Sequence, residues 1–273
     1  MRAPALLAGG VLLMAAGAAF GGPRVFSLDQ CADQYVLALS PRTDIVGLSK
    51  RVRAPDSFLR AKAVGLPERR ATVESVLAAR PQVVVRYWGG DAGLTAALAR
   101  RGVRVLTIDD ATDFAGVRTN IRRIAAGLGQ AAAGERLIRG MDADLAAAAG
   151  AGRGRGLYYV TSGGDTQGPG TLIDAMIRAA GFANLATRPG YGVLSLESLV
   201  LHPPALVALG FFDENMAAYE RWSVGRSQVL RRLATERGTV SLRGAILGCP
   251  AWFVADGAVA LAAWARLHPG PRA

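Results

Sequence analysis

The chain has 273 residues, of which 51% are hydrophobic and 7% aromatic, so it can bury the cores of two lobes of roughly 100–130 residues each. Its formal net charge of +11 comes from 32 lysine and arginine residues against 21 aspartate and glutamate residues. These basic residues are dispersed, and no zinc finger, recognition helix or aromatic RNA-binding motif accompanies them. We therefore predict a solvated basic surface and no nucleic-acid partner.

The start of the chain is typical of a signal peptide. Arg2 supplies a positive charge, Leu6–Met14 is an apolar stretch, and Ala16–Ala19 offers small residues for cleavage. The apolar stretch is shorter than the ~20 residues that a membrane-spanning helix needs. No cysteine directly follows the small residues, which argues against a lipoprotein anchor. We predict a cleaved signal peptide at residues 1–19 and a mature protein that is soluble, monomeric and periplasmic.

Residues 20–112 alternate short apolar strands with helices, which predicts an α/β lobe with a mainly parallel, Rossmann-like sheet. The expected strands are Val25–Leu28, Ile45–Leu48, Gln82–Tyr87 and Val103–Ile108. A helix capped by Asp29 and ended by Pro41 follows the first strand, Leu94–Arg101 is a further helix, and Arg51–Lys62 is a loop.

The segment Asp113–Ala149 interrupts this alternation with two helices and no strand. The second helix is rich in alanine and places Leu137, Met141 and Leu145 at four-residue spacing, on one face. Either this helix is a stiff spine that joins two lobes, which we favour, or it packs on the first lobe alone.

Residues 150–273 return to the alternation and predict a second lobe, with the ligand cleft between the two. Gly150–Gly156 follows a helix and precedes a strand, the reverse of a dinucleotide-binding fingerprint, so we interpret it as the connection between lobes. The expected elements are strands at Leu157–Thr161, Ala205–Phe211 and Ala245–Leu247, a glycine-rich loop at Ser162–Thr171, and helices at Leu172–Ala180, at two stretches after Phe211, and at Asp256–Leu267.

Two segments of the chain copy each other without a gap. Thr72–Val85 and Ser195–Ala208 each have a hydroxyl N-cap, a short helix, a proline and an apolar strand. Glu74 in the first copy recurs as Glu197 in the second, just after the cap. Each glutamate either complements its helix dipole or, as one of a pair, contacts a basic site on a symmetric partner.

Ligands of open α/β sheets bind beyond the carboxyl ends of the strands, so residues that follow strands are the candidates for a site. Those we select are Asp29, Gln30, Tyr87, Trp88, Gly89, Ser162, Phe211, Trp252 and Phe253. Asp110, Gly163 and Phe212 also follow strands. The aromatic residues suit a cleft that holds a large, partly apolar ligand, although each aromatic could instead fill the core.

Signals of catalysis are weak in this sequence. The two histidines, His202 and His268, form no metal cluster or catalytic triad, and no GxSxG motif is present. Asp109 and Asp110 are typical of a turn and a helix cap. We predict no catalytic residues, no bound metal and no cofactor, and an exported two-lobed α/β enzyme is the less favoured alternative.

The two cysteines, Cys31 and Cys249, each follow a predicted strand, one in each lobe. In an oxidising compartment a pair of cysteines favours a disulfide. The alternative is a pair of free thiols that face the cleft.

The order and spacing of several motifs resemble the periplasmic substrate-binding proteins of ABC importers, of the helix-linked type that bind cobalamin, haem or iron siderophores. The motifs are VFSLDQCADQYVLAL, TVESVLAARPQVVV, RYWGGDAGLTAALARRGVRVLTID, TLIDAMIRAAGFANLA and SLESLVLHPPALVALG, and together they cover nearly all the mature chain. The match is closest to the cobalamin-binding branch, in which an aromatic residue and two glycines follow the first glutamate unit, as Tyr87, Gly89 and Gly90 do here.

This resemblance implies two lobes joined by one spine helix, and a ligand in the cleft that is a corrinoid or, alternatively, haem or a ferric siderophore. It also implies that Glu74 and Glu197 dock on an ABC permease dimer, which a separate ATPase drives. The chain departs from the cobalamin branch in lacking a tyrosine in Arg51–Lys62 and an Asp-Trp pair near Trp252. Three arginines predicted near the cleft could pair with an acidic ligand: Arg51, Arg53 and Arg86.

Overall fold

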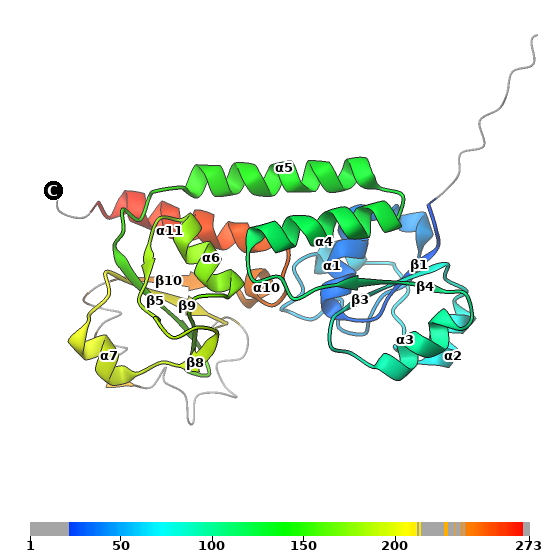
Figure 1. Cartoon of the computed structure of the whole chain (residues 1–273), viewed down its shortest axis with the longest axis horizontal. Coiled ribbons are helices and arrows are strands. Elements are labelled where there is room, and N and C mark those ends of the chain that lie inside the picture. The colour runs from blue at the N-terminus through cyan, green and yellow to red at the C-terminus, as the bar shows by residue number, and fades with distance from the viewer. Residues whose placement is uncertain are drawn as a thin grey trace, which may run out of the picture.

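A computed structural model describes residues 22–211, 213, 227–228, 232, 236 and 238–269 of the chain. It shows two lobes side by side, each built on its own sheet, with long helices packed along one side of both (Figure 1). The signal peptide predicted at residues 1–19 lies outside the described residues, as do Phe212 and most of the two helical stretches predicted after Phe211.

The first lobe contains a four-stranded sheet in the order β2-β1-β3-β4, and all neighbouring strands are parallel. The strands are β1 (Val25–Ser27), β2 (Ile45–Gly47), β3 (Val83–Tyr87) and β4 (Arg104–Ile108). The valines that open β3 are fully buried, because helices cover both faces of a parallel sheet and leave no polar face.

The second lobe repeats this plan with a four-stranded parallel sheet in the order β10-β9-β5-β7. Its strands are β5 (Gly156–Thr161), β7 (Ala183–Asn184), β9 (Leu206–Gly210) and β10 (Thr239–Leu242). The two sheets have the same strand order when the strands of each lobe are counted along the chain. In both lobes, the first strand lies between the second and the third, and the fourth lies at the edge beside the third. The predicted fold class, two α/β lobes with mainly parallel sheets, is therefore confirmed.

Helices connect the strands in both lobes. They are α1 (Gln30–Leu39), α2 (Val73–Ala78), α3 (Ala92–Ala99), α4 (Phe114–Gly127), α5 (Ala131–Ala148), α6 (Leu172–Ala179), α7 (Leu196–Leu201), α10 (Gly244–Leu247) and α11 (Ala255–Leu267). Three short 3₁₀ helices are η1 (Arg42–Asp44), η2 (Arg60–Ala63) and η4 (Trp252–Val254). No helix in the described part of the chain is long and apolar enough to cross a membrane.

The copied units occupy equivalent places in the two lobes. The side chain of Thr72 accepts a hydrogen bond from the backbone of Ser75 at the start of α2, and Ser195 does the same for Ser198 at the start of α7. Each helix then leads into the third strand of its sheet, β3 or β9. Helices α2 and α7 both lie on the side of the molecule away from α5 (Figure 1).

The alanine-rich helix α5 extends along both lobes (Figure 1). It packs against α4, which covers the first sheet, and against α11 of the second lobe. Its buried face carries Ile138 and Met141, which belong to a core cluster that continues through both lobes. The helix thus has the position of a spine rather than that of a helix on the first lobe alone.

Two details of the second lobe differ from the sequence prediction. The prediction of a strand at Ala245–Leu247 is wrong, because these residues belong to the short helix α10. The fourth strand of the sheet is β10, which comes immediately before this helix. The glycine-rich segment Ser162–Thr171 is not only a loop, since it contains β6 (Asp165–Gln167), which pairs antiparallel with β8 (Tyr191–Val193). This two-stranded ribbon has no counterpart among the described residues of the first lobe.

Candidate ligand-binding pocket

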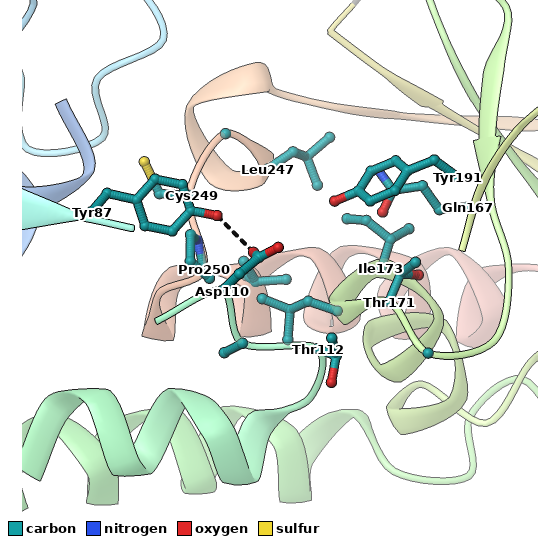
Figure 2. Close-up of a pocket in the computed structure, with 15 residues that line it drawn as sticks. Tyr87, Asp110, Thr112, Gln167, Thr171, Ile173, Tyr191, Leu247, Cys249 and Pro250 are labelled. Carbon is teal, nitrogen blue, oxygen red and sulfur yellow. Dashed lines mark hydrogen bonds between the residues drawn. The ribbon is translucent and has the colours of Figure 1, made fainter. Parts of the chain in front are cut away.

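A pocket of about 110 Å³ lies between the two lobes (Figure 2). The first lobe contributes Tyr87, Asp110, Ala111 and Thr112. The second lobe contributes Gln167, Gly170, Thr171, Leu172, Ile173, Tyr191 and Val254, and the segment Leu247–Pro250 completes the lining. The pocket is smaller than the ~300–1,000 Å³ of a typical small-molecule site. A large ligand would therefore place only one edge in it.

Parallel strand order brings the first-lobe residues together. Tyr87 is the last residue of β3 and pairs in register with Ile108, the last residue of β4, so Asp110 emerges beside it. The Tyr87 hydroxyl donates a hydrogen bond to Asp110 Oδ1 at 2.6 Å, and the Tyr87 backbone N–H donates to Asp29 Oδ2 at 2.7 Å. Burial and the bond to Asp110 raise the pKa of Tyr87, so its hydroxyl stays protonated at neutral pH.

The ribbon of β6 and β8 brings the second-lobe residues to the opposite wall. Gln167 and Tyr191 are directly paired across this ribbon, and both point into the pocket (Figure 2). A side chain at Gly168 would place its Cβ 1.9 Å from the carbonyl oxygen of Arg188, so only glycine allows the close approach there. Burial, with a smaller effect of the nearby Asp110 charge, raises the pKa of Tyr191. Neutral hydroxyls thus face the pocket from both lobes.

The floor of the pocket joins the lobes covalently. Cys31 at the start of α1 forms a disulfide with Cys249, which lines the pocket. Next to it, the Tyr35 hydroxyl donates a hydrogen bond to the carbonyl oxygen of Pro250 at 2.7 Å. Of the two states that the sequence left open for the cysteines, the structure has the disulfide rather than free thiols.

Of the nine ligand-binding residues predicted from the sequence, only Tyr87 is in the pocket lining. Asp29 lies behind Tyr87 as the N-cap of α1, where burial raises its pKa against the effect of three backbone hydrogen bonds. Trp88 is 52% exposed and meets Tyr87 edge to face at 6.2 Å. Gly89 has a φ of +81°, and Gln30 accepts a hydrogen bond from Arg51.

The remaining predicted residues lie outside this lining. Ser162 and Phe211 follow β5 and β9, and Phe211 has a φ of +62°, a strained value for a residue with a side chain. Trp252 contacts Tyr35 edge to face. Phe253 is 1% exposed, because its ring is stacked on Phe58 of the first lobe at 4.3 Å. These two aromatics lie in the contact between lobes, next to the floor of the pocket.

The arginines predicted near the cleft are engaged elsewhere. Arg51 pairs with Asp56 at 2.7 Å, and Arg53 pairs with Glu68 at 2.5 Å. Arg86 donates to the carbonyl oxygen of Tyr87 at 3.0 Å. None of the three lines the pocket.

Sequence reasoning missed most of the second-lobe wall, including Gln167, Thr171 and Tyr191. It named Asp110 as a strand-end residue but interpreted it as part of a turn. The available signal was Tyr191 itself, a large aromatic between two glycines, which the structure places beside the pocket with 75% of its surface exposed.

The pocket has the chemistry of a binding site. Its polar groups are hydroxyls, one amide and one carboxylate, and the described residues include no group of three or more side chains that could hold a metal ion. No hydroxyl among the described lining residues is paired with a histidine. Two α/β lobes around a pocket of this kind define a two-lobed ligand-binding protein.

The family follows from comparison with known proteins. A model of the periplasmic binding protein family matches residues 25–210, and the chain belongs to this family. It is a family of binding proteins, not of enzymes. The two copied glutamate units both fall within the matched residues.

Similar curated proteins are the cobalamin-binding proteins of two Halobacterium salinarum strains, each 30% identical over 218 residues. The match covers 76% of this chain but only 59% of the length of those relatives.

Solved structures share the fold. A periplasmic haem-binding protein of Vibrio cholerae has a TM-score of 0.73 at 19% identity, with 90% of this chain and 99% of that chain covered. The periplasmic vitamin B12-binding protein of Vibrio cholerae has a TM-score of 0.61 at 16% identity, with 90% and 97% covered. A haem-binding protein of Roseiflexus sp. RS-1 has a TM-score of 0.69 at 23% identity, with 90% and 100% covered.

Proposed function

We propose that the protein is the exported ligand-binding component of an ABC importer, that it captures a corrinoid such as cobalamin between its lobes, and that it delivers this ligand to a permease dimer. The ligand is supported by the cobalamin-binding relatives and by the aromatic and amide groups around the pocket. Haem or a ferric siderophore is the second candidate, because proteins of the same fold bind haem.

The observation that carries the delivery role is the matched pair of glutamates. Glu74 and Glu197 are both exposed, and each lies in the first turn of a helix that occupies the same place in its lobe. Both helices lie on the side away from α5 (Figure 1). Two acids presented in this way fit two basic sites on a symmetric partner, here the two permease subunits.

The delivery role is tested by reversing both charges. The variant Glu74→Arg/Glu197→Arg should bind ligand as the wild type does, because neither residue lines the pocket, but should no longer support uptake. A matched control is Glu135→Arg/Asp144→Arg on α5, which changes the net charge equally; Asp144 is exposed, and the side chain of Glu135, which pairs with Arg122, is 46% exposed. Uptake that survives in the first variant, or is lost equally in the control, contradicts the docking role.

The ligand is tested on the purified protein. The absorption spectrum and mass of any copurifying molecule come first, followed by titration with cyanocobalamin, haemin and a ferric chelate. Recovery of the titrated ligand unchanged separates a binding protein from an enzyme. Tightest binding of cyanocobalamin supports the proposal, and binding of haemin or the ferric chelate alone assigns the second candidate.

A further inference from the structure

The pocket and the protein as a whole carry opposite charge. The chain has a formal net charge of +11. Among the described residues, however, Asp110 is the one charged side chain in the pocket lining. A site built to take an anionic ligand would be expected to present arginine or lysine, and the described lining contains neither.

The setting of Asp110 differs from that of its neighbour Asp109. Asp109 Oδ2 accepts a hydrogen bond from Arg123 Nη1 at 2.7 Å, so its charge is paired. Asp110 is exposed, and its Oδ1 accepts a hydrogen bond at 2.6 Å from the neutral hydroxyl of Tyr87. Figure 2 shows the carboxylate of Asp110 between Tyr87 and the far wall that carries Tyr191. Within the part of the chain that the structure describes, no hydrogen bond occupies the second oxygen of Asp110, which leaves it open to a ligand.

The carboxylate is also fixed in place. Tyr87 ends a central strand, and its backbone is bound to Asp29, which caps α1. The hydroxyl of Tyr87 can therefore hold Asp110 at one position without neutralising it. A fixed carboxylate accepts strongly from N–H donors and repels a second carboxylate placed opposite it.

We propose that Asp110 is a specificity-determining residue: it accepts a hydrogen bond from a neutral donor on the ligand edge, such as a carboxamide, and it disfavours ligands that present a carboxylate there. This inference rests on the proposed function and deepens it. Corrinoids carry carboxamide side chains, whereas haem carries two propionates. Asp110 therefore selects the first ligand class against the second.

The test compares amide and acid forms of one ligand. Wild-type protein, Asp110→Asn and the control Asp109→Asn are titrated with cyanocobalamin and with its monocarboxylic acids, in which one side-chain amide is replaced by a carboxylate. Haemin is the third probe. Wild type should favour cyanocobalamin over at least one of the monocarboxylic acids and over haemin.

Only Asp110→Asn is expected to lose the discrimination between the amide and acid forms of the ligand. Asp110→Asn should weaken cyanocobalamin binding by about 10- to 100-fold, the effect of one hydrogen bond to a charged group. It should weaken the acid forms less, so the preference for the amide falls by at least about tenfold. Asp109→Asn should leave both affinities unchanged. A purely structural role for Asp110 would weaken both ligand forms alike.

The outcomes separate this inference from the proposed function. Wild type that binds cyanocobalamin, with Asp110→Asn showing the same amide-to-acid preference, overturns the inference and leaves the proposed function standing. Wild type that binds haemin more tightly than cyanocobalamin also overturns the role of Asp110. Wild type that binds none of the probes overturns the proposed corrinoid ligand, and the inference with it.

Discussion

The two lobes are built on one plan, yet they hold an equivalent buried carboxylate in different ways. In each lobe, the helix after the first strand carries an aspartate that bonds to the region of the second strand. Asp33 of α1 accepts from the backbone N–H and the hydroxyl of Ser49, at 2.9 and 2.6 Å. Asp174 of α6 accepts from Asn184 of β7 at 2.8 Å and also from Arg178 at 2.7 Å. One carboxylate thus has neutral partners and the other has a cation.

The neutral partners of Asp33 only partly offset the effect of burial on its pKa. Burial raises the pKa of Asp33 to about 6, even though its hydrogen bonds to serines oppose the shift. The shared fold therefore sets the position of the buried aspartate in each lobe. The hydrogen-bond partners, which differ between the lobes, set how well its negative charge is stabilised. The lobes are equivalent in topology and unequal in electrostatics.

The largest expected effect comes from removing the covalent link between the lobes. Cys31→Ser/Cys249→Ser should lower the free energy of unfolding by about 4–5 kcal/mol, the upper end for disulfides, because the bond closes a very long loop. The two cysteines are 218 residues apart in sequence. Urea unfolding followed by tryptophan fluorescence measures the change. Wild type in a reducing agent should match the variant, and an unshifted midpoint would contradict the prediction.

The pH dependence of stability tests the raised pKa of Asp33. The pKa of Asp33 is raised in the folded state, so the folded protein retains its proton over a range where the unfolded chain has lost it. The free energy of unfolding should therefore fall by up to about 3 kcal/mol as the pH rises from about 4 to about 6. Asp33→Asn should flatten this slope in urea titrations at several pH values. A slope that Asp33→Asn leaves unchanged would contradict the prediction.

The second carboxylate should matter more at neutral pH. Asp174→Asn leaves Arg178 without its anionic partner and alters the bond to Asn184, so we expect a loss of about 1–2 kcal/mol at pH 7. The Arg178 side chain is 57% exposed, which keeps the loss small. Denaturation midpoints of this variant and of Asp33→Asn at pH 7 give the comparison. A larger loss for Asp33→Asn would mean that the two sites do not differ as described.

The smallest effect tests the equivalence of the copied units. Thr72→Ala and Ser195→Ala each remove one N-cap hydrogen bond, and each should cost about 1 kcal/mol of stability. The two N-cap hydrogen bonds have similar donor-to-acceptor distances, 3.3 Å in the first lobe and 3.2 Å in the second. Thermal unfolding of both variants should show equal shifts, and clearly unequal shifts would limit the equivalence to topology.

Local signals account for what could be predicted from the sequence. The copied units depend on a hydroxyl cap, a proline and an apolar strand, all within a few residues, and the structure contains both units as expected. The spacing of residues such as Met141 on one face predicts the long helix α5, and its packing against α4 and α11 then identifies it as the spine. The parallel direction of the strands follows from the alternation of strands and helices along the chain.

The pocket could not be predicted as well, because it depends on residues that meet only in three dimensions. Gln167 and Tyr191 pair across a ribbon whose first strand, β6, contains only polar residues and so gives no alternating apolar pattern. The run Ala245–Leu247 is apolar and short, and a run of this length does not distinguish a strand from a buried helix. Phe253 stood out as an aromatic, but only its contact with Phe58 shows that it faces the opposite lobe rather than the pocket.

The floor of the pocket also constrains how the two lobes can move. The disulfide, the bond from Tyr35 to Pro250 and helix α5 all tie the halves together away from the tips that carry Glu74 and Glu197. A swing about this tethered edge moves the far tips most, since displacement grows with distance from an axis of rotation. If the lobes swing about this tethered edge, the distance between Glu74 and Glu197 changes more than any distance near the floor of the pocket.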